Sequence, residues 1–127
     1  MKRTILATAL AATFAMVPAT QAQAPKVSGD VIRIGFITDM SGLYADIDGP
    51  AGGEAIKMAI EDMKGQVLGK KIEVLVADHQ NKADVASSKA REWFDQQGLD
   101  VLIGGTNSAT SFFNDTATTE KKKPFLA

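Results

Sequence analysis

The residues best suited to binding chemistry lie between positions 104 and 110, in the run Gly104-Gly105-Thr106-Asn107-Ser108-Ala109-Thr110. Two glycines allow the backbone to approach a ligand closely, and hydroxyl side chains follow where a helix is predicted to begin. Unpaired backbone N–H groups and the helix dipole attract anions at such a position. We therefore expect Ser108 and Thr110 to donate hydrogen bonds to an anion and Asn107 to orient it.

The chemistry of this loop favours a carboxylate over a polyphosphate, because the loop contains no lysine or arginine. It does not follow the phosphate-loop pattern Gly-x-x-x-x-Gly-Lys-Ser/Thr, and residues 49–53 do not form the dinucleotide pattern Gly-x-Gly-x-x-Gly. The alternative reading is structural, with Ser108 or Thr110 serving only as a helix cap.

A second group of polar side chains occupies residues 39–53, namely Asp39, Ser41, Tyr44, Asp46 and Asp48. Ser41 and Tyr44 are further candidates for ligand binding, and Tyr44 is placed to cover a ligand unless it is simply an exposed loop aromatic. The three carboxylates raise the possibility of a metal site, but the glycine and spacing of a calcium loop are missing. We expect a solvated loop with helix caps and no metal.

His79 is the only histidine, and the chain has no cysteine. A zinc site or a Cys/His nucleophile pair therefore has too few ligands. Ser108, His79 and Asp78 supply the residue types of a catalytic triad, but no Gly-x-Ser-x-Gly nucleophile elbow is present. We expect no catalytic residue and no cofactor.

The elements that position these residues alternate between strands and helices. The apolar runs at 31–38, 71–77 and 101–103 predict strands, and the patterns at 54–65 and 83–97 predict helices, the second capped by Asn81. A third helix is possible after residue 105, and residues 124–127 resemble the start of another buried strand. The order β-α-β-α-β predicts an α/β fold with part of a doubly wound parallel sheet.

In such a sheet, ligands bind outside the carboxyl ends of the strands. The segments predicted at that edge are 39–53, 78–81 and 105–110. Trp93 lies on the apolar stripe of its helix and is expected in the core.

The first 22 residues have the pattern of a secretory signal peptide. A basic start, Met1-Lys2-Arg3, precedes an apolar run too short to cross a bilayer, and small residues lead to a cleavage site after Ala22. An uncleaved membrane anchor is the alternative. The mature chain is therefore expected outside the cytoplasm.

Composition narrows the classes of partner. The chain has 127 residues, 45% of them hydrophobic, and a formal charge of −1. This charge argues against broad attraction to nucleic acid or anionic lipid. An exported domain without disulfides fits a bacterial periplasmic protein. The part after the leader suffices for one small domain.

Four stretches resemble the branched-chain amino-acid (Leu/Ile/Val) type of periplasmic binding proteins of ABC importers. They are IGFITDMSG at 34–42, GEAIKMAIED at 53–62, DHQNKAD at 78–84 and IGGTNSAT at 103–110. The resemblance implies a type I periplasmic-binding fold, whose two lobes close on a small molecule and deliver it to a membrane permease. It implies a periplasmic monomer that binds aliphatic amino acids, amides, urea or aromatic acids.

The same resemblance implies roles for individual residues. By position, Ser108 and Thr110 bind the ligand carboxylate, and Tyr44 or Ile47 lies where the family often places an aromatic residue. A sensor domain of a receptor shares this fold and is the first alternative. An exported α/β hydrolase is the second.

The chain departs from the family in two respects. Family members are much longer, so residues 23–127 are expected to form an incomplete first lobe that binds weakly or not at all. Residues 111–120, SFFNDTATTE, replace the alanine- and aliphatic-rich helix expected there. Residues 114–120 also match the translation of one reading frame of a common sequencing adapter. We hypothesise that this stretch arose during sequence assembly.

Overall fold

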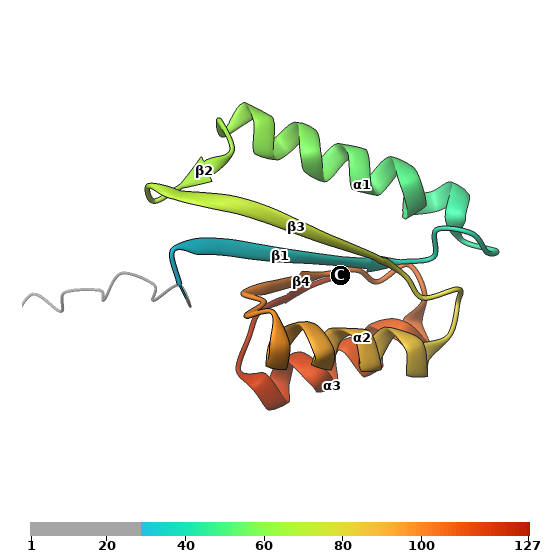
Figure 1. Ribbon diagram of the computed structural model, residues 1–127. Helices are drawn as coiled ribbons and strands as arrows, with labels where there is room; N and C mark the ends of the chain where they lie inside the picture. The colour runs from blue at the N-terminus through green and yellow to red at the C-terminus, as the bar shows by residue number, and fades with distance from the viewer. Residues whose placement is uncertain (1–28) are drawn as a thin grey trace, which may run out of the picture.

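The computed structural model describes residues 29–127, so the predicted signal peptide lies outside the described residues. The described chain folds into one five-stranded sheet with helices on both faces (Figure 1). The strands are β1 (Val31–Thr38), β2 (Gln66–Val67), β3 (Lys70–Asp78), β4 (Val101–Ile103) and β5 (Phe125–Leu126). The helices are α1 (Ala45–Asp62), α2 (Ala83–Gln96) and α3 (Ser108–Lys121).

The sheet has the order β2-β3-β1-β4-β5, with β1 at its centre. β1 pairs in parallel with β3 and with β4, and β5 pairs in parallel with β4. This confirms the predicted α/β fold. The exception is β2, a short antiparallel partner of β3 that was not predicted. The two strands form a hairpin in which Leu68 and Gly69 both take positive φ values, of 51° and 74°, as a type I′ two-residue turn requires.

The face covered by α2 and α3 contains the well-packed core (Figure 1). Ile37 and Leu102 from the sheet pack there with Trp93 of α2 and Ala117 of α3. Trp93 is 5% exposed, which confirms its predicted place in the core. Gly35 brings β1 close to the indole, because a Cβ at this position would lie 2.8 Å from Trp93 Cε3.

The opposite face is covered by α1, which begins earlier than predicted. The glycines and Pro50 suggested a loop over residues 39–53, but the helix already starts at Ala45. It contains a kink at Gly49, where ψ is −111°, and Pro50 opens the straight part that follows. Gly52 permits close approach to the sheet, because a Cβ there would lie 2.8 Å from Phe36 Cζ.

α3 is helical although its sequence disfavours a helix. Two threonines satisfy their hydroxyl groups on the backbone of the same helix: Thr116 donates to the Phe112 carbonyl, and Thr118 to the Asn114 carbonyl. Two ion pairs at the surface join the helix to α2: Arg91 with Glu120 and Lys121 with Asp95. Asn114 is fully buried, and neither its Oδ1 nor its Nδ2 has a hydrogen-bond partner among residues 29–127.

A candidate ligand-binding edge of the sheet

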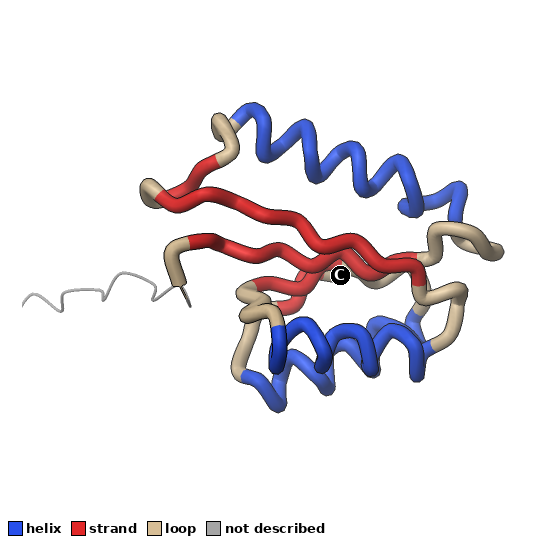
Figure 2. The backbone as a smooth tube through the Cα atoms, viewed as in Figure 1, coloured by secondary structure: helices blue, strands red, loops and turns tan. Residues whose placement is uncertain are grey.

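The three predicted segments meet at the carboxyl edge of the parallel strands. The loops after β1 and β3 lie together at the right-hand end of the molecule in Figure 2. The Ser41 hydroxyl donates to Asp78 Oδ2 at 2.5 Å, which joins these two loops. The Asn107 amide donates to Asn81 Oδ1, which joins the loop after β3 to the loop after β4.

The loop after β1 is shaped by carboxylates that accept hydrogen bonds. Asp39, completely buried, accepts from the backbone N–H groups of Gly42 and Tyr44. Asp48 accepts from the Thr38 hydroxyl at 2.7 Å. Asp39 and Asp48 thus hold the loop and the first turn of α1. No group of three metal-ligating side chains occurs among residues 29–127.

Asp78, at the end of β3, holds the loop after β1 through hydrogen bonds. Its Oδ1 accepts from the backbone N–H groups of Met40 and Gln80, at 3.0 and 2.7 Å, while its Oδ2 accepts from Ser41. Partial burial alone would raise the pKa of Asp78, but these three hydrogen bonds outweigh it and hold the pKa below its ordinary value. Asp78 is therefore an ionised structural anchor.

His79 is buried beneath the same turn and is 1% exposed. Its Nδ1 accepts from the Asn81 N–H at 2.9 Å, so the proton of the neutral ring is on Nε2. Burial lowers the pKa of His79, although the negative charges of Asp39, Asp78 and Asp48 raise it in part. No hydrogen bond among residues 29–127 joins His79 to Ser108, so the residues considered as a triad do not form a relay.

The amino end of α3 is capped by Asn107, not by Ser108 or Thr110. Asn107 Oδ1 accepts from the N–H groups of Ala109 and Thr110, at 2.7 and 3.3 Å. Thr110 is 1% exposed, and its hydroxyl donates to the Asn107 carbonyl. The Ser108 side chain is exposed and makes no side-chain hydrogen bond within residues 29–127.

The predicted cap of α2 is wrong. Asn81 is not the residue before the helix, because Lys82 takes that position without a side-chain cap. Asn81 instead has a φ of 57°, and its side chain points to the neighbouring loop, where it accepts from Asn107. Local sequence reasoning missed this contact because its partner lies 26 residues away in the chain.

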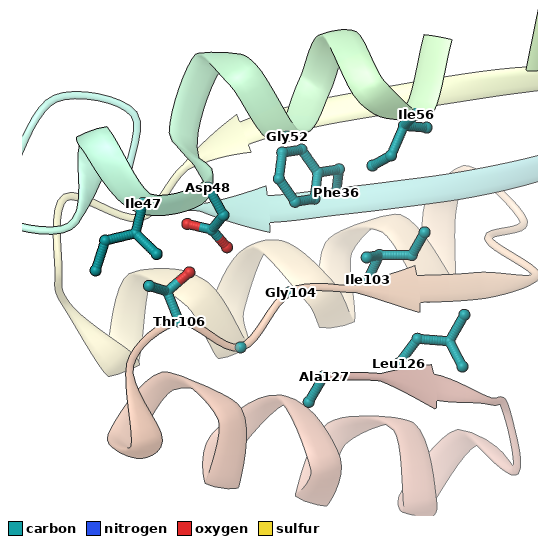
Figure 3. A pocket seen from close by; sticks show the side chains of 11 residues that line it. Phe36, Ile47, Asp48, Gly52, Ile56, Ile103, Gly104, Thr106, Leu126 and Ala127 are labelled. Carbon is teal, nitrogen blue, oxygen red and sulfur yellow. The ribbon is translucent and has the colours of Figure 1, made fainter. Parts of the chain in front are cut away.

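An apolar groove of about 440 Å³ opens beside this edge, on the face of the sheet that carries α1 (Figure 3). Its floor comes from neighbouring strands, through Phe36 and Ile103, and Ile56 of α1 forms one wall. Asp48 and Thr106 lie at its polar end. Ile47 lines this groove, whereas Tyr44 does not. The groove was not predicted, because its lining residues come from segments far apart in the sequence.

Comparisons with known proteins agree with this arrangement. The sequence profile of the periplasmic binding protein family matches residues 31–127. A periplasmic binding protein from Burkholderia mallei is 66% identical, with a TM-score of 0.74, over 76% of this chain and 26% of that one.

Two further solved structures show the same fold. A branched chain amino acid ABC transporter periplasmic ligand-binding protein from Burkholderia xenovorans is 42% identical, with a TM-score of 0.71, over 75% of this chain and 26% of that one. A solute binding protein of an ABC transporter from Rhodopseudomonas palustris, in complex with 3,4-dihydroxy benzoic acid, is 28% identical. Its TM-score is 0.72, over 76% of this chain and 26% of that one.

No curated protein sequence matches the chain. The chain spans about a quarter of the length of the solved structures that it matches. Among residues 29–127, no helix is both long enough and apolar enough to cross a membrane. The profile match over residues 31–127 and the shared fold establish that this chain belongs to the periplasmic binding protein family.

Proposed function

We propose that this chain contributes part of the first lobe of a solute-binding protein that serves an ABC importer. Its solute is a small carboxylate, either a branched-chain amino acid or an aromatic acid. Family membership supports the class of protein, and the similar proteins from Burkholderia xenovorans and Rhodopseudomonas palustris support the class of solute. The role is binding and delivery to a membrane permease, without catalysis.

The observation that carries this proposal is the exposed Ser108 at the amino end of α3. Asn107 satisfies the N–H groups of Ala109 and Thr110, but it does not engage the Ser108 hydroxyl. That hydroxyl and the first N–H of the helix are donors in a region where the helix dipole favours negative charge. Ser41, on the adjacent loop, is joined to this edge through Asp78.

The roles of the other predicted residues are refined by their contacts. Asn107 caps α3 and so fixes the first turn of the helix, which contains Ser108. Thr110 helps to build the first turn of α3, since its N–H donates to Asn107 Oδ1 and its hydroxyl donates to the Asn107 carbonyl. Tyr44 is half-buried at the start of α1, and we propose that it borders the ligand from the side.

We propose that the protein is exported and binds its solute in the periplasm, as its family suggests. We propose that residues 1–22 are a cleaved signal peptide and that residues 23–127 form part of one lobe. The sensor domain of a receptor remains a second use of the same fold. The hydrolase alternative lacks support, because Asp78 accepts from Met40, Ser41 and Gln80, and His79 Nδ1 accepts from the Asn81 N–H.

The test is a titration followed by nuclear magnetic resonance, which detects weak binding by an incomplete lobe. L-leucine and 3,4-dihydroxybenzoate are added to the ¹⁵N-labelled chain, with leucinamide as a probe that lacks the carboxylate. We expect the carboxylates to shift the Ser108 amide signal and leucinamide to leave it in place.

Ser108→Ala removes one donor to a charged group, which corresponds to about 1.5–3 kcal/mol of binding free energy. Stability should change little, because Ser108 is not the cap. Equal shifts for leucine and leucinamide would show that this edge does not recognise carboxylates, and no shift with either would show that the incomplete lobe does not bind them by itself.

A further inference from the structure

The turn at residues 78–81 contacts both loops that border the candidate site. At its first residue, Asp78 accepts from the Ser41 hydroxyl and from the Met40 N–H in the loop after β1. At its last residue, Asn81 accepts from the Asn107 side chain in the loop after β4. One four-residue turn therefore holds the two candidate ligand loops at a fixed separation.

Asn107 has two functions that depend on the same amide plane. Its Oδ1 caps α3, and its Nδ2 donates to Asn81 Oδ1. The second contact fixes the rotation of the amide about χ2, a torsion that is otherwise broad. A fixed cap oxygen in turn fixes the first turn of α3, where the Ser108 hydroxyl and N–H begin.

Asn81 is itself rigidly placed. Its backbone has a φ of 57°, a conformation that asparagine tolerates better than most residues. Its N–H donates to Nδ1 of the buried His79 at 2.9 Å, and the His79 N–H donates to the Thr38 carbonyl at the end of β1. A continuous series of hydrogen bonds thus runs from the central strand to the amino end of α3.

We propose that Asn81 is a positioning residue for carboxylate binding, acting through Asn107 to orient the Ser108 donors. This inference rests on the proposed function and adds a residue that touches no ligand. Asn81 was predicted to cap α2, but in the structure its side chain accepts a hydrogen bond from Asn107, the residue that caps α3.

The test uses variants that separate this role from stability. Asn81→Gly keeps the positive φ and removes the side-chain acceptor, whereas Asn107→Ser keeps a capping oxygen and removes the amide Nδ2 that donates to Asn81. Gln80→Gly is the matched control, because Gln80 also has a positive φ, of 50°, but does not contact Asn107. Affinity for L-leucine and 3,4-dihydroxybenzoate is measured from the Ser108 amide shift, and stability from thermal unfolding.

We expect each single variant to weaken carboxylate binding about 2- to 12-fold, the equivalent of one neutral hydrogen bond. The double variant should be no weaker than the weaker single, because both changes break the same bond. Gln80→Gly should bind as the parent does. Unchanged affinity in Asn81→Gly, additive losses in the double variant, or a loss that follows unfolding would overturn the proposal.

A second measurement remains informative if the parent chain binds neither carboxylate. That result shows that this incomplete lobe does not bind carboxylates by itself, and ¹⁵N relaxation of the Ala109 and Thr110 amides then tests the positioning separately. We expect these two amides to become more mobile in Asn81→Gly and to stay rigid in Gln80→Gly. Equal order parameters in all three proteins would show that Asn81 does not position α3.

Discussion

Replacing Asn114 by leucine should stabilise this protein. Asn114 is 0% exposed, and both polar atoms of its amide lack a hydrogen-bond partner among residues 29–127. Its neighbours on the buried side of α3 include Ala117, which belongs to the hydrophobic core. Leucine has the same number of side-chain heavy atoms as asparagine and also branches at Cγ, but its tetrahedral Cγ and its methyl groups need more space than the planar amide.

The expected gain follows from three contributions. An unsatisfied buried polar group costs about 1–3 kcal/mol, and leucine also has the higher helix propensity by a few tenths of a kcal/mol. The slightly larger methyl groups oppose this gain, because overpacking costs about 1 kcal/mol or more. We expect a net increase of about 1 kcal/mol in the free energy of unfolding. In a domain of this size, that raises the melting temperature by roughly 4–8 °C.

The assay is urea unfolding followed by circular dichroism, with Thr119→Leu as the control. Thr119 is exposed on the same helix, so that change reports helix propensity without the buried amide. The control should gain no more than a few tenths of a kcal/mol. If Asn114→Leu is no more stable than Thr119→Leu, the Asn114 amide is satisfied in solution and the reasoning fails.

Four further outcomes are expected. Gly35→Ala should lower the free energy of unfolding by about 1–3 kcal/mol, because the new Cβ would lie 2.8 Å from Trp93 Cε3. Gly29→Ala is the control: a Cβ there has no neighbour within 4 Å, so the same unfolding assay should show no change. Burial lowers the pKa of His79 below its ordinary value of 6.5. The stability that the neutral His79 ring contributes is therefore complete above pH 6.5 and decreases as the pH falls from 6.5 towards the pKa of His79 in the folded protein. His79→Asn, which keeps an acceptor for Asn81, should flatten this part of the stability profile. The pKa of Asp78 is also lowered, so the stability that Asp78 contributes is lost as the pH falls below its ordinary pKa of 3.8. Asp78→Asn should remove this loss of stability in acid. Finally, DNA sequencing of independent molecules across codons 111–120 should reveal apolar residues in place of Asn114 and its neighbours, and reads that retain NDTATTE across both junctions would disprove the assembly hypothesis.

The buried polar stripe of α3 bears on that hypothesis. Thr110, Asn114 and Thr118 recur every four residues on the buried side of the helix, where apolar residues are normally selected. The two threonines satisfy their hydroxyls on the helix backbone, but Asn114 has no such solution. A gain of stability at Asn114 and only there would identify this residue as unsuited to its position.

The strands and the location of the candidate site were predictable from local patterns. Val31–Thr38 and Val101–Ile103 are nearly continuous apolar runs, as strands covered on both faces require. Their alternation with helices dictates parallel pairing, and parallel pairing brings the segments after each strand to one edge. The early start of α1 was not predictable, because Gly49 and Gly52 are typical of loops until the approach of Asp39 and Phe36 is known.

The sequence by itself determined the main strands and helices, the edge of the sheet that they leave open and the loops that reach that edge, because periodicity and turn chemistry act over a few residues. Only the tertiary structure decided how those side chains are used. Asn81 Oδ1 accepts from Asn107, 26 residues away in the chain, and the Thr110 hydroxyl donates to the Asn107 carbonyl. Ser108 is left exposed. The physical reason is that a polar side chain bonds to whichever partner folding brings within about 3 Å, and that partner need not be near it in the chain.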